Sequence, residues 1–192
     1  MRTQILIAGH GGQGVVELGN YIAHEAIGKG FHVASTPTYG PETRGGKVKT
    51  YVIVSNEEID SPIVENPDII IVMNSPSMDF ESELKSGGLM IINSSIIDKA
   101  PVRTDTRIVK VPATDLADNI ISKVPQDILQ GIKDTRFVAN SVIFGTYLAL
   151  LGINLDEIKL YRVLENIFSG KKASLIPLNI IAIKDGYSFI KA

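Results

Sequence analysis

The stretch Gln4-Ile5-Leu6-Ile7-Ala8-Gly9-His10-Gly11-Gly12-Gln13-Gly14 decides the fold, because an apolar run ends there in a cluster of glycines. Residues 4–8 are typical of a buried strand, and residues 15–29 repeat apolar side chains at helical spacing. The glycines therefore fall at a turn from strand to helix, where glycine allows a positive φ and a close approach of the backbone. The N–H groups of a helix N-terminus can receive a phosphate or a carboxylate at such a turn.

The glycines match the G-x-G-x-x-G pattern of dinucleotide-binding proteins. Such a site also uses an acidic residue at the end of the second strand, and the strand expected at residues 31–36 has none. A P-loop is excluded, because no lysine followed by serine or threonine stands in the required register. A dinucleotide site and simple close packing of strand and helix stay open as alternatives to an anion site.

The composition is that of an ordinary globular protein. The 192 residues suit one domain, and hydrophobic residues make up 44% and charged residues 21% of them. A formal net charge of −2 gives no case for nucleic-acid or membrane-surface binding, and no apolar run is long enough to span a bilayer. Without cysteine the chain cannot hold a disulfide or a cysteine-ligated iron–sulfur cluster, and its three histidines lack metal-site spacing. We expect a cytoplasmic protein without a metal site.

The order of elements predicts an α/β fold over residues 1–192 as a single domain. We expect a three-layer α/β/α sandwich with a mostly parallel sheet, a Rossmann-like start and a helical C-terminal third. Further strands are expected at 47–55, 68–74, 89–93 and 107–111, and helices at 80–85, 112–122, 137–151, 156–168 and 171–185. The helix at 137–151 is apolar nearly all round, so we expect it to be buried in the domain or against a partner. The isolated chain is therefore expected to form a homo-oligomer.

The second candidate segment is Pro37–Gly46, whose two prolines and three glycines exclude regular structure. It follows a strand, as the turn Gly9–Gly14 does, so both should lie at the sheet edge where α/β proteins bind ligands. Arg44 is placed there for a bidentate contact with a phosphate or carboxylate, although a surface arginine paired with Glu42 is the simpler alternative. No nucleophile–base pair, carboxylate pair or metal cluster emerges, so no catalytic residue is predicted.

Several motifs together carry a family resemblance. They are Gly9–Val15, Tyr39–Gly46, Ile59-Asp60-Ser61-Pro62, Pro67-Asp68, Asn140–Gly145 and the pair Asn179 and Gly186. In this order they resemble the gamma subunit of the 2-oxoacid:ferredoxin oxidoreductases, which act on 2-oxoglutarate, pyruvate or ketoisovalerate. The same unit is an internal domain of single-chain pyruvate:ferredoxin oxidoreductase. The resemblance covers nearly the whole chain and favours 2-oxoglutarate or a branched-chain 2-oxoacid as the substrate.

The resemblance implies an auxiliary, non-catalytic subunit of an oxidoreductase complex with alpha, beta and possibly delta subunits. Such a complex decarboxylates a 2-oxoacid on thiamine diphosphate, reduces ferredoxin through iron–sulfur clusters and transfers the acyl group to coenzyme A. Thiamine diphosphate and the clusters would belong to the partner subunits, and this chain would cover the active site and help to bind coenzyme A. The residues implied in that contact are Gly9, Gly11, Gly12, Gln13, Gly14, Tyr39, Glu42 and Arg44.

One residue departs from the expected pattern. Glu17 places a carboxylate in the first turn of the predicted helix, where it would disfavour a phosphate if it faced the glycine turn. In that case the turn would contact a partner subunit instead. A free-standing dinucleotide-binding oxidoreductase and a purely structural subunit are the alternative functions.

Overall fold

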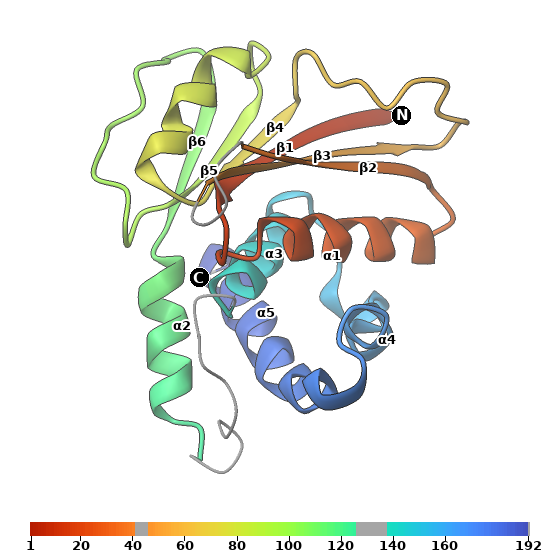
Figure 1. Cartoon of the computed structure of the whole chain (residues 1–192), viewed down its shortest axis with the longest axis vertical. Coiled ribbons are helices and arrows are strands. Elements are labelled where there is room, and N and C mark those ends of the chain that lie inside the picture. Colours follow the sequence, from red (N-terminus) through yellow and green to blue (C-terminus); the bar gives the residue numbers. More distant parts are fainter. Residues whose placement is uncertain (41–45, 126–137, 192) are drawn as a thin grey trace. The chain divides into compact units, whose positions relative to one another are not determined.

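The computed structural model describes residues 1–40, 46–125 and 138–191 (Figure 1). The chain forms two compact units, Met1–Val111 and Pro112–Ala192. The boundary falls where the strands end and the helical part begins. That the whole chain acts as a single domain stays a prediction.

The first unit contains a six-stranded sheet with the strand order β2-β3-β1-β4-β5-β6. Its strands are β1 (Arg2–His10), β2 (His32–Tyr39), β3 (Lys47–Ser55), β4 (Ile69–Val72), β5 (Leu89–Asn93) and β6 (Arg107–Val111). Strands β1, β4, β5 and β6 are parallel neighbours, whereas β3 is antiparallel to both β1 and β2. The predicted α/β fold is confirmed, with a mixed sheet.

The start of the chain differs from a simple β-α-β unit in one respect. Strand β3 lies between β1 and β2, so the helix that follows β1 leads to a strand two places away. Strands β2 and β3 are close in sequence and pair antiparallel, as short connections require. The alternation of residues 47–55 indicates a strand but contains no information on which strand it joins.

The segment from residue 37 was expected to lack regular structure, yet residues 37–39 complete strand β2. Pro37 is tolerated because β2 is an edge strand. The amide of Gly40 donates to the carbonyl of Lys47 at 2.8 Å, and hydrogen-bonded pairs alternate along an antiparallel ladder. Residue 37 therefore directs its nitrogen away from β3, where no N–H is needed.

Helical segments cover both faces of this sheet (Figure 1). Helix α1 (Val15–Gly28) packs on one face, where a Cβ on Gly19 would lie only 2.5 Å from Cγ2 of Thr50. The 3-10 helix η1 (Ser75–Glu83) takes the place of the expected helix at 80–85 and packs on the other face. The core of that second face consists of Leu6, Ile70, Val72, Met78, Leu84, Met90, Ile92 and Ile97. The first unit is thus built in three layers.

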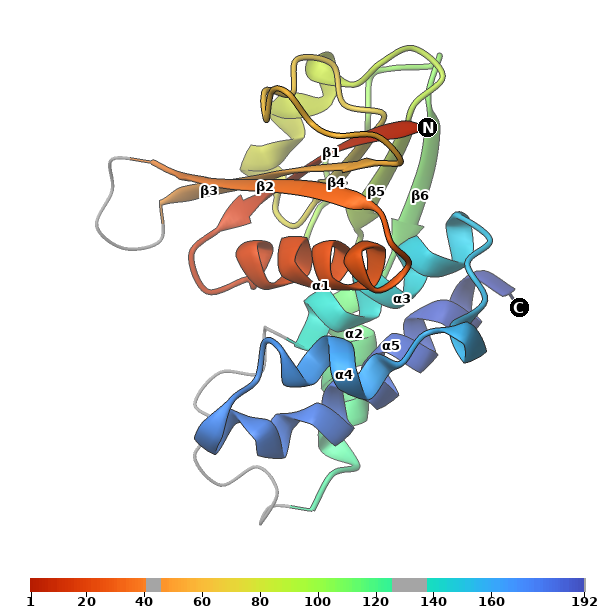
Figure 2. The same cartoon turned by 90° about the vertical axis from the view of Figure 1, so that its right-hand side faces the viewer.

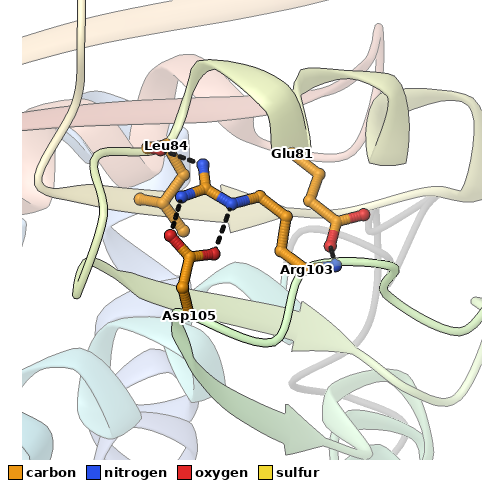
Figure 3. A network of polar contacts seen from close by, with 4 residues as sticks. All are labelled: Glu81, Leu84, Arg103 and Asp105. Atoms are coloured by element: carbon orange, nitrogen blue, oxygen red, sulfur yellow. Dashed lines mark hydrogen bonds and ion pairs between the residues drawn. The ribbon is translucent and has the colours of Figure 1, made fainter.

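A polar network holds the segment that links β5 to β6 against the helix η1 (Figure 3). The backbone N–H of Arg103 donates to buried Glu81 at 2.7 Å, and its guanidinium donates to the Leu84 carbonyl and to both oxygens of Asp105. The hydrogen bonds from Arg103 hold the pKa of Asp105 well below its usual range. The network closes the amino-end side of the sheet and is separate from the glycine turn.

The second unit is helical and comprises α2 (Ala113–Ser122), α3 (Val138–Leu150), η2 (Leu155–Glu157), α4 (Leu160–Glu165), η3 (Gly170–Leu175) and α5 (Ile176–Lys191). The helix expected at 156–168 is a 3-10 turn followed by the short α4. The last helix begins later than expected, at Ile176, so Pro177 lies in its first turn, where proline is tolerated.

Helices α3 and α5 lie side by side in backbone contact (Figure 2). A Cβ on Gly145 would lie 1.9 Å from the Ile183 carbonyl oxygen, and one on Gly186 would lie 1.9 Å from that of Val142. At the same crossing Ser141 donates to Oδ1 of Asn179 at 2.6 Å. The late motif residues are therefore explained by helix packing, because only glycine permits this approach.

The apolar helix expected at 137–151 is α3, and its residues 138–149 are all buried within this chain. Its composition thus gives no evidence for a partner surface, and homo-oligomerisation stays a prediction. Among the described residues, no helix combines the length and the apolar character that crossing a membrane requires.

Candidate functional site

The turn between β1 and α1 has the backbone geometry that its glycines predict. Gly12 has a φ of 94° and Gly14 a φ of 69°, both in the left-handed region that favours glycine. Gly9 serves a different purpose, because a Cβ there would lie 2.8 Å from Oε1 of Gln13 and from Cγ2 of Val15. The turn is therefore tight, and the side chain of Gln13 folds back beneath it.

Gln13 is buried, with 5% of its surface exposed, and its amide makes three hydrogen bonds inside the protein. Its Oε1 accepts from the His10 backbone N–H at 3.0 Å and from Nδ2 of Asn74 at 3.2 Å. Its Nε2 donates to the Met73 carbonyl at 2.7 Å. Gln13 thus joins the glycine turn to the end of strand β4, and its side chain holds the turn in place.

Asn74 extends this connection to the next element. While its Nδ2 donates to Gln13, its Oδ1 accepts from the Ser77 backbone N–H at 3.0 Å and caps η1. One amide pair therefore fixes three segments at the same sheet edge: the glycine turn, the end of β4 and the start of η1. The sequence feature that indicates this connection is the amide side chain of Gln13 inside a glycine turn.

The two predicted segments meet at this edge. Strands β1 and β2 run in the same direction, since each is antiparallel to β3. Their carboxyl ends therefore lie together, and the Gly11 amide donates to the Gly46 carbonyl at 3.2 Å. The expected proximity is confirmed for the described ends of the segments. Glu42 and Arg44 lie outside the described residues.

A pocket of about 260 Å³ opens where these segments meet. It is lined by His10, Gly11, Gly12, Gly14, Val15, Val16, Glu17, Tyr39 and Val48. Four of the residues implied by the family resemblance thus come together there, namely three glycines and Tyr39. Gly9 and Gln13 lie behind the turn and are not part of the lining. The valines were missed because their sequence context resembles ordinary strand and helix, and His10 was missed because the histidines lack metal-site spacing.

The electrostatics of this pocket are mixed. The first N–H groups of α1 have no partner within the helix, and Gly14 at the N-cap has no side chain to cap them, which favours a negative group. Glu17 adds a carboxylate, and within the described part of the chain it has no ion-pair partner. Among the residues that the structure describes, no lysine or arginine lines the pocket. The described lining can therefore receive hydrogen-bond acceptors and donors but does not neutralise a phosphate.

Other motif residues have structural roles. Asp68 accepts from the Gln4 backbone N–H at 2.9 Å and pairs with Lys85 at 2.9 Å. The carbonyl of Ser61 accepts from Arg2 at 3.1 Å. These contacts lie at the amino ends of β1 and β4, away from the pocket. Within the described ranges, no cluster of three or more acidic or histidine side chains is placed to hold a metal ion.

Comparison with known proteins identifies the family to which this chain belongs. Residues 4–189 match the family model described as pyruvate ferredoxin/flavodoxin oxidoreductase. The chain belongs to this family, which confirms the resemblance stated from the sequence.

Two relatives differ in how much of their own length this chain covers. It is 32% identical over 185 residues to the ketoisovalerate oxidoreductase subunit VorA of Methanothermobacter marburgensis, covering 96% of this chain and 36% of VorA. The chain thus spans about a third of that relative. It is 30% identical to the 2-oxoglutarate synthase subunit KorC of Methanocaldococcus jannaschii, covering all of this chain and 95% of KorC.

A solved structure has the same fold. It is the 2-oxoglutarate:ferredoxin oxidoreductase of Magnetococcus marinus with 2-oxoglutarate, coenzyme A and succinyl-CoA bound. The TM-score is 0.80 at 22% identity, over 99% of this chain and 31% of that one. At this identity the likeness shows the fold alone.

Proposed function

We propose that this chain is the gamma-type subunit of a 2-oxoacid:ferredoxin oxidoreductase. The complex would oxidatively decarboxylate a 2-oxoacid to an acyl-CoA and reduce ferredoxin. The family match supports this proposal, as does the near-complete coverage of KorC, which is named as a single subunit. Relatives named for 2-oxoglutarate and for ketoisovalerate both match, so the substrate is proposed as 2-oxoglutarate or a branched-chain 2-oxoacid.

The remaining chemistry would belong to the partners. A sequence without cysteine supplies no thiolate for an iron–sulfur cluster, which supports clusters on other subunits. Thiamine diphosphate is likewise assigned to the alpha and beta subunits, with ferredoxin as the electron acceptor of the complex. This chain would be an auxiliary subunit without catalytic residues of its own.

The observation that carries the proposal for this chain is the pocket at the carboxyl edge of the sheet. The glycine turn and Tyr39 converge there, at the edge where open α/β sheets bind ligands. We assign this pocket to coenzyme A, and we assign the surface around it to the cover of the active site. The coenzyme A bound in the Magnetococcus structure supports a ligand of this kind in an assembly with the same fold.

The test uses the assembled complex with and without this chain. Gly12→Ala should raise the Michaelis constant for coenzyme A, because Cβ at a φ of 94° distorts the pocket wall. Gly87→Ala is the matched control, since Gly87 has a φ of 73° but lies before β5 with nothing within 4 Å of an added Cβ.

We expect Gly12→Ala to raise the Michaelis constant for coenzyme A at least about fivefold, because a strained left-handed residue costs ~1–2 kcal/mol. Gly87→Ala should leave this constant unchanged. The first electron from the 2-oxoacid should stay unchanged in both variants. If the subunit were purely structural, the Michaelis constant for coenzyme A would instead be the same in the two variants. A free-standing dinucleotide enzyme would bind NAD(H) without partners, which titration followed by fluorescence detects.

A further inference from the structure

We propose that the pocket at the start of α1 binds an uncharged, amide-bearing segment of its ligand and excludes the phosphate groups. If the ligand is coenzyme A, as proposed above, this segment is the pantetheine arm, and the phosphates bind outside the pocket. The inference rests on the proposed function for the identity of the ligand. Its physical basis is the set of described residues that line the pocket.

Charge is the first argument. Glu17 lines the pocket, and the described lining residues include neither lysine nor arginine. No described residue pairs with the Glu17 carboxylate. At an effective dielectric of about 20, a second negative charge about 5 Å away costs roughly 3 kcal/mol. The N-terminus of a helix stabilises a negative group by only about 0.3–1 kcal/mol at such a partly exposed site. A phosphate in this pocket is therefore disfavoured on balance.

The polarity of the wall is the second argument. Val15, Val16 and Val48 supply an apolar part of the lining, to which Tyr39 adds an aromatic ring. Against this wall Glu17 offers an acceptor, and the first N–H groups of α1 are the donors. A secondary amide presents the complementary pair, because its N–H donates to a carboxylate while its carbonyl accepts from a backbone N–H. Its neighbouring methylene and methyl groups can cover the valines.

The size of the pocket is the third argument. Its volume of about 260 Å³ is below the roughly 300–1,000 Å³ of sites that enclose a whole drug-sized ligand. The pocket can therefore take one segment of a larger molecule. The pyrophosphate of a dinucleotide, which would sit at the helix N-terminus in a Rossmann site, would there meet the Glu17 carboxylate.

The experiment measures competitive inhibition of coenzyme A-dependent turnover in the assembled complex by two fragments. One is S-methyl pantetheine, which carries the amides without phosphate, and the other is adenosine 3′,5′-bisphosphate. Glu17→Ala should raise the inhibition constant of the arm about tenfold, and Glu17→Gln, which keeps an acceptor oxygen, should restore most of it. Both variants should leave the bisphosphate constant within twofold. Glu58→Gln, an exposed change beyond the opposite end of the sheet, is the control and should alter neither.

The opposite pattern overturns the inference. If phosphate occupied the pocket, Glu17→Ala would tighten the bisphosphate about tenfold or more and leave the arm unchanged. If neither constant moved, the pocket would not be a ligand site. Failure of the proposed function is distinct, because the wild-type chain would then fail to restore coenzyme A-dependent turnover to the complex lacking it.

Discussion

Replacing Gln13 by leucine removes the amide that joins the glycine turn to strand β4. The change would leave the His10 N–H, the Met73 carbonyl and the Asn74 amide without the partner they have in the native protein. An unsatisfied buried group costs about 1–3 kcal/mol. Met73 is 1% and Asn74 8% exposed, so these two are affected most and His10 least. We expect Gln13→Leu to lower the free energy of unfolding by about 3–5 kcal/mol.

The measurement is urea unfolding of the isolated chain, followed by circular dichroism. Gln4→Leu is the control for the residue change itself, because Gln4 lies on the preceding strand β1, is half-buried and has no hydrogen bond from its side chain among the described residues. Surface substitutions of this kind stay within about 0.5 kcal/mol. Gln13→Glu adds a second comparison, since it keeps the size and replaces the Nε2 donor by an oxygen that cannot donate to Met73 when ionised.

A loss below about 1 kcal/mol for Gln13→Leu would refute this reasoning, because it would mean that the turn keeps its place without the amide. A large loss for Gln4→Leu as well would show that the exchange of glutamine for leucine, and not the lost hydrogen bonds, is responsible. The stability loss should also reach the pocket. Where the Gln13→Leu chain still assembles into the complex, the Michaelis constant for coenzyme A should rise, because the turn that forms the pocket is no longer fixed to β4.

Two further predictions concern structure away from the pocket. Because the pKa of Asp105 is lowered by Arg103, their contribution to stability should be present above the ordinary aspartate pKa of about 3.9 and be lost as the pH falls toward the lowered value. The difference in unfolding free energy between wild type and Arg103→Ala should therefore shrink in acid, while Lys99→Ala, in an exposed pair, should show little difference at any pH. Gly186→Ala should destabilise the chain by about 1–3 kcal/mol or more, since its Cβ would lie 1.9 Å from the Val142 carbonyl oxygen. Gly28→Ala, with open space around its Cβ, should be neutral or stabilising, and equal unfolding midpoints for the two alanine variants would contradict the close helix contact.

Local patterns predicted most of the strands but not their neighbours. The runs at residues 69–72 and 89–93 are apolar throughout, which is typical of central parallel strands, and both are central. The place of β3 between β1 and β2 depends on pairing between strands distant in sequence, which periodicity does not encode. The break between η2 and α4 was missed for a similar reason, since amphipathic spacing continues through both.

The candidate site was predicted where it depends on backbone conformation and missed where it depends on distant partners. A positive φ at Gly12 follows from glycine in a strand-to-helix turn, and the sequence alone indicates it. The direction of Gln13 is set by the Met73 carbonyl, 60 residues later, so the amide that seemed to face a ligand faces the interior. The need for glycine at residues 145 and 186 likewise becomes clear only when α3 and α5 are seen packed together, because each glycine faces the backbone of the other helix.

Glu17 and Arg44 carry opposite charges, and each is expected to suit a different group of one ligand. Glu17 lines the described pocket and makes it unsuitable for phosphate, whereas Arg44 is the arginine of the 37–46 segment and lies outside the described residues. The phosphate contact expected of Arg44 and the neutral contact proposed for the pocket involve different groups of the ligand. A ligand with a charged end and an uncharged amide arm satisfies both, and coenzyme A has this construction. A ligand made only of phosphates, or only of apolar groups, would leave one of the two regions without a complementary partner.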